Sequence, residues 1–129
     1  MKYLLDTHLI LWAANESKNL SPKMRKILED ENNVLFFSVI SVWEISIKSG
    51  LGKFDFSVKA ETIRQGLLQN GYHELMVNGS HASAAGELPL LHRDPFDRML
   101  ITQAKLEGIT LLTSDKVVAQ YPAPIQLVS

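Results

Sequence analysis

The chain contains no cysteine among its 129 residues. This absence excludes a disulfide-stapled fold, a thiolate metal site and a cysteine nucleophile. There is also no excess of charge of one sign, because 13 Lys and Arg stand against 14 Asp and Glu, for a formal net charge of −1. Such a balance is not typical of a basic nucleic-acid coat protein. The length and a hydrophobic content of 46% indicate one folded domain, which we expect to span residues 1–129.

Long hydrophobic runs are absent as well. Apolar runs such as residues 34–37 are far shorter than the roughly 20 residues that a membrane-spanning helix needs. The apolar stretch after Lys2 ends at Asp6, which is too early for a secretory signal peptide. We therefore expect a cytoplasmic protein that does not contact a membrane.

Short apolar runs alternate along the chain with segments of helical periodicity. The runs predict strands at 3–5, 33–37, 72–77, 110–113 and 125–128. Helices are predicted at 8–14, from 22 to about 31, at 41–49 and at 80–87. Two more are expected, one capped by Ser57 and ending at Asn70, and one running from Asp94 to Gly108. Strands separated by helices favour an α/β fold with a central, mainly parallel sheet and helices on both faces.

Carboxylates follow the predicted strands. Asp6 comes after the first strand, Glu44 lies in the first turn of the helix after the second, and Asp115 follows the fourth. The carboxyl ends of parallel strands share one edge, so these acids should converge, joined by Asp97 if its helix passes that edge. The helix starts should lower the pKa of Glu44 and Asp97. Such oxygen ligands suit Mg²⁺ or Mn²⁺, while the histidines show no H-x-x-x-H spacing that would favour zinc.

Each acid also admits a purely structural role. Ser41 and Glu44 have the spacing of a capping box, and Glu44 with Lys48 forms a favourable i, i+4 pair. Asp94 is a good helix cap before a proline, and Asp115 could simply open a turn. The joint placement of the acids, rather than any one of them, therefore carries the metal-site hypothesis.

Four segments resemble a PIN-domain nuclease, and most closely a VapC-type toxin of a bacterial toxin–antitoxin pair. They are LLDTHLILW (4–12), SVISVWEISIKSGLGK (38–53), HRDPFDRMLITQAKLEG (92–108) and LLTSD (111–115). The resemblance implies a three-layer α/β/α sandwich, endoribonuclease activity that depends on Mg²⁺ or Mn²⁺, a homodimer and a cognate antitoxin. By this likeness the metal-binding, catalytic acids are Asp6, Glu44, Asp97 and Asp115. Residues 55–88 carry no motif, and the RNA target stays unassigned.

Further residues receive roles by proximity or by resemblance. Thr7 and Ser114 resemble the hydroxyl residues that support such a site, and Asp94 is a candidate auxiliary acid. Trp12 and Trp43 have apolar neighbours, so we expect them in the core rather than as stacking surfaces for bases. Basic residues near the acids in sequence are candidates to hold RNA phosphates: Lys48, Lys53, Arg93, Arg98 and Lys116.

Other functions compete with the nuclease hypothesis. A catalytically silent module of the same fold would bind RNA or protein without cutting. A phosphotransfer domain is disfavoured, because Asp6-Thr7-His8 provides neither an acidic pair nor a D-x-D motif at the first strand. Cleavage through the RNA 2′-hydroxyl usually needs a histidine pair, for which His8 and His92 are the candidates.

Overall fold

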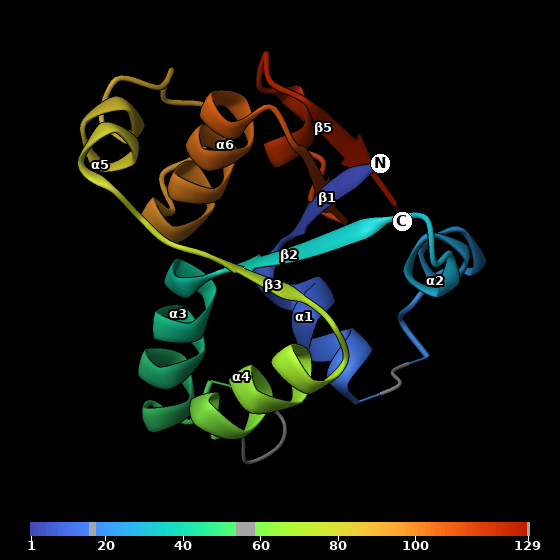
Figure 1. Ribbon diagram of the computed structural model, residues 1–129. Coiled ribbons are helices and arrows are strands. Elements are labelled where there is room, and N and C mark those ends of the chain that lie inside the picture. The colour runs from blue at the N-terminus through green and yellow to red at the C-terminus, as the bar shows by residue number, and fades with distance from the viewer. Residues whose placement is uncertain (16–17, 54–58, 129) are drawn as a thin grey trace.

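A five-stranded parallel sheet forms the centre of the protein, in a computed structural model that describes residues 1–15, 18–53 and 59–128 (Figure 1). The strand order is β3-β2-β1-β4-β5, and every neighbouring pair is parallel. The strands are β1 (Lys2–Leu5), β2 (Val34–Ser38), β3 (His73–Leu75), β4 (Thr110–Thr113) and β5 (Ile125–Leu127). The predicted α/β class and parallel sheet are confirmed.

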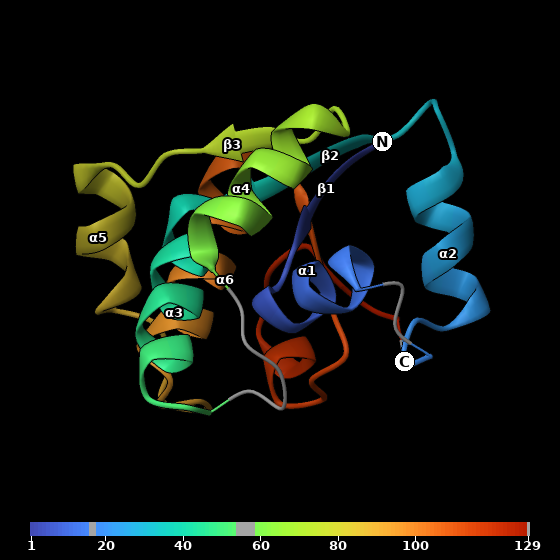
Figure 2. The same ribbon diagram turned by 90° about the horizontal axis from the view of Figure 1, so that it is seen from below.

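Helices cover both faces of the sheet and complete a three-layer α/β/α sandwich (Figures 1 and 2). One face carries α1 (Thr7–Ala14), α2 (Pro22–Glu29) and α4 (Ala60–Gln69). The other carries α6 (Pro95–Glu107) and the short 3₁₀ helix η1 (Val118–Gln120), and α5 (Gly79–Ala85) packs against α6. Helix α3 (Val39–Gly50) continues directly from β2 and packs against both α4 and α6.

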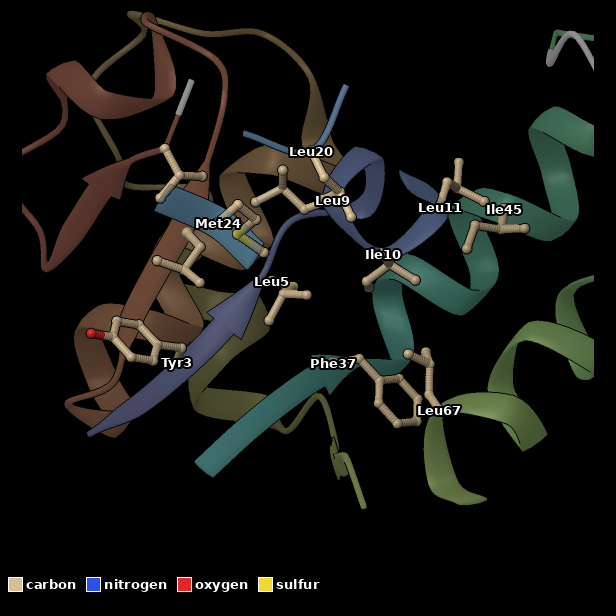
Figure 3. Close-up of a cluster of buried hydrophobic side chains, with 12 residues drawn as sticks. Tyr3, Leu5, Leu9, Ile10, Leu11, Leu20, Met24, Phe37, Ile45 and Leu67 are labelled. Carbon is tan, nitrogen blue, oxygen red and sulfur yellow. The ribbon is translucent and has the colours of Figure 1, made fainter. Parts of the chain in front are cut away.

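Successive side chains of a strand point to opposite faces of the sheet, so a hydrophobic core forms on each side. In β1, Tyr3 and Leu5 join one cluster of buried side chains, whereas Leu4 between them joins the other. Figure 3 shows the first cluster, in which Phe37 from β2 and Met24 from α2 are fully buried. Each fully buried aliphatic or aromatic side chain stabilises the fold by about 1.5–3 kcal/mol. The two cores fix the strands, and with them the loops at the strand ends.

The start of α3 differs from the prediction. Ser38 is the N-cap, and its hydroxyl accepts a hydrogen bond from the backbone N–H of Ile40 at 3.1 Å. The predicted capping box of Ser41 and Glu44 is therefore wrong, because both residues lie inside the helix and are buried. The predicted cap Ser57 lies outside the described residues.

The connectivity creates a reversal of strand order at the middle of the sheet. The chain builds outward from β1 through β2 to β3, then crosses back to place β4 on the other side of β1. Open α/β sheets bind their ligands at such a switch point, beyond the carboxyl ends of the strands. Asp6 follows β1 and Asp115 follows β4, so both lie beside this point. Within the described residues, none of the helices combines the length and apolar character needed to cross a membrane.

Candidate functional site

Asp6 is fixed at the carboxyl end of β1 by hydrogen bonds to both of its oxygens. Its Oδ1 accepts from the backbone N–H of Leu9 at 2.9 Å, which makes Asp6 the N-cap of α1. Its Oδ2 accepts from the Thr113 hydroxyl of β4 at 2.7 Å. Burial raises the pKa of this carboxyl, and the two hydrogen bonds partly offset the rise. The side chain is thus held rigidly at the switch point between β1 and β4.

Glu44 enters the same region from α3. The Thr7 hydroxyl donates to its Oε1 at 2.5 Å, and Ser41 Oγ lies 3.0 Å from that hydroxyl. Its Oε2 forms an ion pair with Lys48, one turn further along the helix. The Lys48 ammonium group also lies 3.9 Å from Asp94 Oδ2, so this cation sits between acids of α3 and α6.

The first turn of α6 brings two further acids. Asp94 is the N-cap, and its Oδ1 accepts from the backbone N–H of Phe96 at 2.8 Å. Burial, followed by repulsion from Asp94 and Glu44, raises the pKa of Asp97 to about 7. This result contradicts the expectation that the helix start lowers the pKa of Asp97. Asp6 also contributes to the repulsion, which indicates that α6 does pass the edge where the acids gather.

Asp115 and His92 complete the cluster. Asp115 Oδ1 accepts from the backbone N–H of Val117 at 2.8 Å, so this residue does open a turn. Its other oxygen lies 3.5 Å from His92 Nε2, which in turn lies 2.8 Å from Asp97 Oδ2. Sequence reasoning considered His92 only as half of a histidine pair with His8, which is exposed. Its position directly before the acid motif of α6 is the signal that could have identified it.

The backbone of His92 is clamped by two buried side chains. Its N–H donates to the Tyr121 hydroxyl at 2.7 Å, and its carbonyl accepts from Arg98 at 3.2 Å. The same guanidinium donates to three more carbonyls at 2.9–3.1 Å, those of Ala85, Leu88 and Pro89. Arg98 is only 8% exposed, so the prediction that it holds a substrate phosphate is wrong. Its charge instead fixes the loop between α5 and α6.

The remaining predicted residues lie around this centre. Ser114 is half-buried, and its backbone N–H lowers the pKa of Asp6. Trp12 is half-buried against the first core cluster, as expected. Trp43 is 58% exposed, so its predicted place in the core is wrong. The phosphate-binding role stays a prediction for three exposed basic side chains, Lys53, Arg93 and Lys116.

The donor set fits a divalent cation. Asp94 and Asp115 each use one oxygen to cap a backbone N–H and turn the other toward the cluster. Burial, followed by repulsion from Asp94 and Glu44, raises the pKa of Asp97 to about 7. Ligand atoms of His92, Asp97 and Asp115 lie within 4.8 Å of one another. Carboxylate oxygens are the preferred ligands of Mg²⁺ and Mn²⁺, and a bound cation would relieve this repulsion.

A parallel α/β sheet with carboxylates gathered at its switch point defines a class of proteins suited to binding a divalent cation and an anionic ligand. The sequence matches the family model of the PIN domain over residues 3–124, and the chain belongs to the PIN-domain family. PIN domains are typically nucleases, and those nucleases generally use divalent metals.

Solved structures with the same fold come from toxin–antitoxin complexes. A chain of VapBC2 from Rickettsia felis, bound to a promoter DNA fragment, is 20% identical with a TM-score of 0.75, and the match covers 100% of both chains. VapBC from Salmonella typhimurium, bound to DNA, gives 16% identity and a TM-score of 0.68 over 100% of this chain and 99% of that one. A toxin–antitoxin complex from Klebsiella pneumoniae gives 18% and 0.66 over 98% of each chain. No curated protein matches the sequence significantly.

Proposed function

We propose that this chain is an endoribonuclease of the VapC type that depends on Mg²⁺ or Mn²⁺ and acts as a toxin. The observation that carries the proposal is the convergence of acids from β1, α3, α6 and the end of β4 at the switch point of a PIN fold. Burial together with repulsion from Asp94 and Glu44 raises the pKa of Asp97 to about 7, and a bound cation would relieve this repulsion. The catalytic, metal-binding acids of the proposal are Asp6, Glu44, Asp97 and Asp115.

A cation bound by these acids would activate a water molecule and stabilise the charge that develops on the scissile phosphate. Neighbouring side chains orient the acids for binding the cation. The Thr7 hydroxyl orients Glu44, and the Thr113 hydroxyl orients Asp6. Asp94 serves as an auxiliary acid that starts α6 and places Asp97 one turn further along. Lys48 balances part of the negative charge through Glu44 and Asp94, and its ammonium group is a candidate contact for a phosphate oxygen of the RNA.

The reaction that we propose is hydrolysis at phosphorus. Water adds to the phosphorus, the bond to the 3′ oxygen breaks, and that oxygen takes up a proton. The products are a 5′-phosphate and a 3′-hydroxyl. The competing route through the 2′-hydroxyl is less well supported, because His92 lies against carboxylates while His8 is exposed.

Partners form part of the same proposal. The similar structures named above are toxin–antitoxin complexes, which supports a cognate antitoxin for this chain. We further propose that the single PIN domain spans residues 1–129 and forms a homodimer. Three exposed basic residues then contact phosphates of the RNA on either side of the cleaved bond: Lys53, Arg93 and Lys116.

Sequencing of new RNA 5′ ends tests the proposal. Total cellular RNA is incubated with the protein and Mn²⁺ or Mg²⁺, beside reactions with EDTA and with Asp6→Asn. We expect discrete new ends that carry 5′-phosphates and disappear in both controls. Ends that persist in EDTA would contradict the metal-dependent mechanism. Mn²⁺ binding without any new ends would favour the silent module that binds RNA or protein.

A further inference from the structure

A lysine ammonium group lies inside the acidic site. Lys48 comes one turn after Glu44 on α3, and its Nζ forms an ion pair with Glu44 Oε2. The same Nζ lies 3.9 Å from Oδ2 of Asp94, the N-cap of α6. It also stands over the Phe96 ring, 5.8 Å from the ring centre. Lys48 therefore fills the space between an acid of α3 and an acid of α6.

The Glu44 carboxylate has a partner on each of its oxygens. Its Oε1 accepts a hydrogen bond from the Thr7 hydroxyl at 2.5 Å, and its Oε2 faces the Lys48 ammonium group. The side chain of Glu44 is only 3% exposed. A buried carboxylate without a counter-charge is costly, so this ion pair is retained unless another cation replaces it. The charge of Glu44 is thus neutralised from within the chain.

The acidic site has a second part without a lysine. Ligand atoms of His92, Asp97 and Asp115 lie within 4.8 Å of one another. Among the residues that the structure describes, this is the one group in which three such atoms converge so closely, and neither Glu44 nor Asp94 belongs to it. An incoming cation therefore finds converging ligand atoms in this part, and an ammonium group already in place in the other.

We propose that the Lys48 ammonium group takes the place of a second divalent cation, so that the acids bind one Mg²⁺ or Mn²⁺ ion rather than two, on the side of Asp97 and Asp115. Two-metal nucleases hold their ions about 3.5–4 Å apart and use the pair to stabilise both the attacking and the leaving oxygen. A second ion here would need oxygens of Glu44 and Asp94, where the ammonium group lies. The inference rests on the proposed function, because it assigns the number of cations at the same site.

Lysine is chemically suited to this role. Its ammonium group is a compact point charge with three donors, so it can pair with Glu44 and still donate to a phosphate oxygen. Its charge is part of the chain and is present at every concentration of divalent cation. An ordinary i, i+4 pair on a helix surface would also place Lys48 beside Glu44, but it would leave the number of bound cations unchanged. That number therefore separates the two interpretations.

The test counts Mn²⁺ ions in the wild-type protein and in three variants, all without RNA. Isothermal titration calorimetry gives the stoichiometry, and electron paramagnetic resonance distinguishes an isolated Mn²⁺ ion from a spin-coupled pair. Lys48→Met removes the charge at similar side-chain length, whereas Lys48→Arg keeps the charge. Lys105→Met is the matched control, because it removes an exposed lysine in the last turn of α6. Circular dichroism checks that each variant is folded.

We expect one equivalent of Mn²⁺ and the spectrum of an isolated ion in the wild type, in Lys48→Arg and in Lys105→Met. Lys48→Met should bind two equivalents and give a spin-coupled spectrum, because Glu44 and Asp94 are then open to a second cation. The affinity of Lys48→Met for the first ion should rise on the order of tenfold, since no ammonium charge repels that ion. If Lys48→Met does not fold, Lys48→Gln replaces it, because glutamine keeps a neutral donor for Glu44.

Other results would overturn the inference. Two equivalents with a spin-coupled spectrum in the wild type would do so and would leave the proposed metal-dependent nuclease intact. A single isolated ion of unchanged affinity in folded Lys48→Met would show that the ammonium group holds no cation position. One bound Mn²⁺ without any RNA cleavage would contradict the proposed function alone. Absence of Mn²⁺ binding in the wild type would contradict both.

Discussion

At the scale of single residues, the capping acids of this site carry two roles at once. Asp94 and Asp115 each satisfy backbone N–H groups with one oxygen and present the other to the cluster. Asp6 likewise caps α1 while its second oxygen is held by Thr113. A role as a helix or turn cap and a role as a metal ligand are therefore compatible for these residues, because the capping hydrogen bond fixes the orientation of the carboxylate.

Asp97→Asn should abolish cleavage and stabilise the metal-free protein. The substitution removes a partly buried charge whose pKa is raised to about 7 by burial and by neighbouring acids. At pH 7.5 without metal we expect the free energy of unfolding to rise on the order of 1–3 kcal/mol, measured by urea denaturation. Wild-type cleavage by this variant would exclude Asp97 from the catalytic set.

Asp94→Asn is the matched control, because asparagine is also a good N-cap. We expect the free energy of unfolding to change by about 1 kcal/mol or less, and some cleavage to remain. Complete loss of cleavage in Asp94→Asn, with activity kept in Asp97→Asn, would reverse the assignment of the two acids.

Sequence alone predicted which acids gather but not the environment of individual side chains. The four acids follow strand ends or helix starts, and those positions are visible as local patterns. The raised pKa of Asp97 depends on Asp94 and Glu44, and Glu44 arrives from another helix. The burial of Arg98 depends on how the loop before α6 folds back to place its carbonyls around the guanidinium. The exposure of Trp43 depends on which face of α3 the neighbouring elements leave uncovered.

At the scale of elements, the connection between α5 and α6 is a loop held by one buried cation. The guanidinium of Arg98 donates to four carbonyl groups of this segment, in place of the pairing that a regular element would provide. The Tyr121 hydroxyl donates to the Pro89 carbonyl and accepts from the N–H of His92. This clamp sets the place of His92 beside Asp97 and Asp115.

Arg98→Met should destabilise the protein and impair the site at a distance. Removal of the guanidinium leaves buried carbonyls without a donor, which should lower the free energy of unfolding by about 2–4 kcal/mol in urea denaturation. Arg98→Lys should retain only part of the wild-type stability, since one ammonium group cannot reach all four carbonyls. Wild-type stability of Arg98→Met would refute the clamp.

The helices and strands themselves were largely predictable, with the exception of the start of α3. Segments with strong periodicity and clear end signals, such as α6 between Asp94 and Gly108, lie where the sequence predicts them. In α3 the sequence offers serines at 38 and 41, and both precede apolar residues. Ser38 is the N-cap because β2 leads directly into the helix at this residue. Ser41 therefore lies inside the helix, where it is buried beside Thr7.

At the scale of the whole molecule, the strand order makes the site. The reversal between β1 and β4 brings together acids that lie more than a hundred residues apart in the chain, such as Asp6 and Asp115. The sequence predicted parallel strands and helices on both faces, but the order β3-β2-β1-β4-β5 needs tertiary information. The fold thus gathers negative charge at a cost in stability that a cation would offset.

The stability of the metal-free protein should fall as pH rises from about 4 to about 7. In the folded chain the pKa of Asp97 is about 7, whereas in the unfolded chain it has the ordinary value of 3.8. Between these two values Asp97 is protonated in the folded state and ionised in the unfolded state. The folded state therefore binds more protons, and the free energy of unfolding decreases with pH. Thermal unfolding at several pH values checks this. Asp97→Asn should flatten the profile, and an equally steep profile in that variant would contradict the assignment.

Mn²⁺ binding measured by isothermal titration calorimetry tests the central claim most directly, namely that these acids form one divalent-cation site. The titration compares the wild-type protein with Asp97→Asn and with the control Arg93→Gln, whose side chain is exposed. The account predicts saturable binding in the wild type and in Arg93→Gln, and a loss of at least tenfold in affinity in Asp97→Asn. Absence of Mn²⁺ binding in the wild type, or equal affinity in Asp97→Asn, would contradict it.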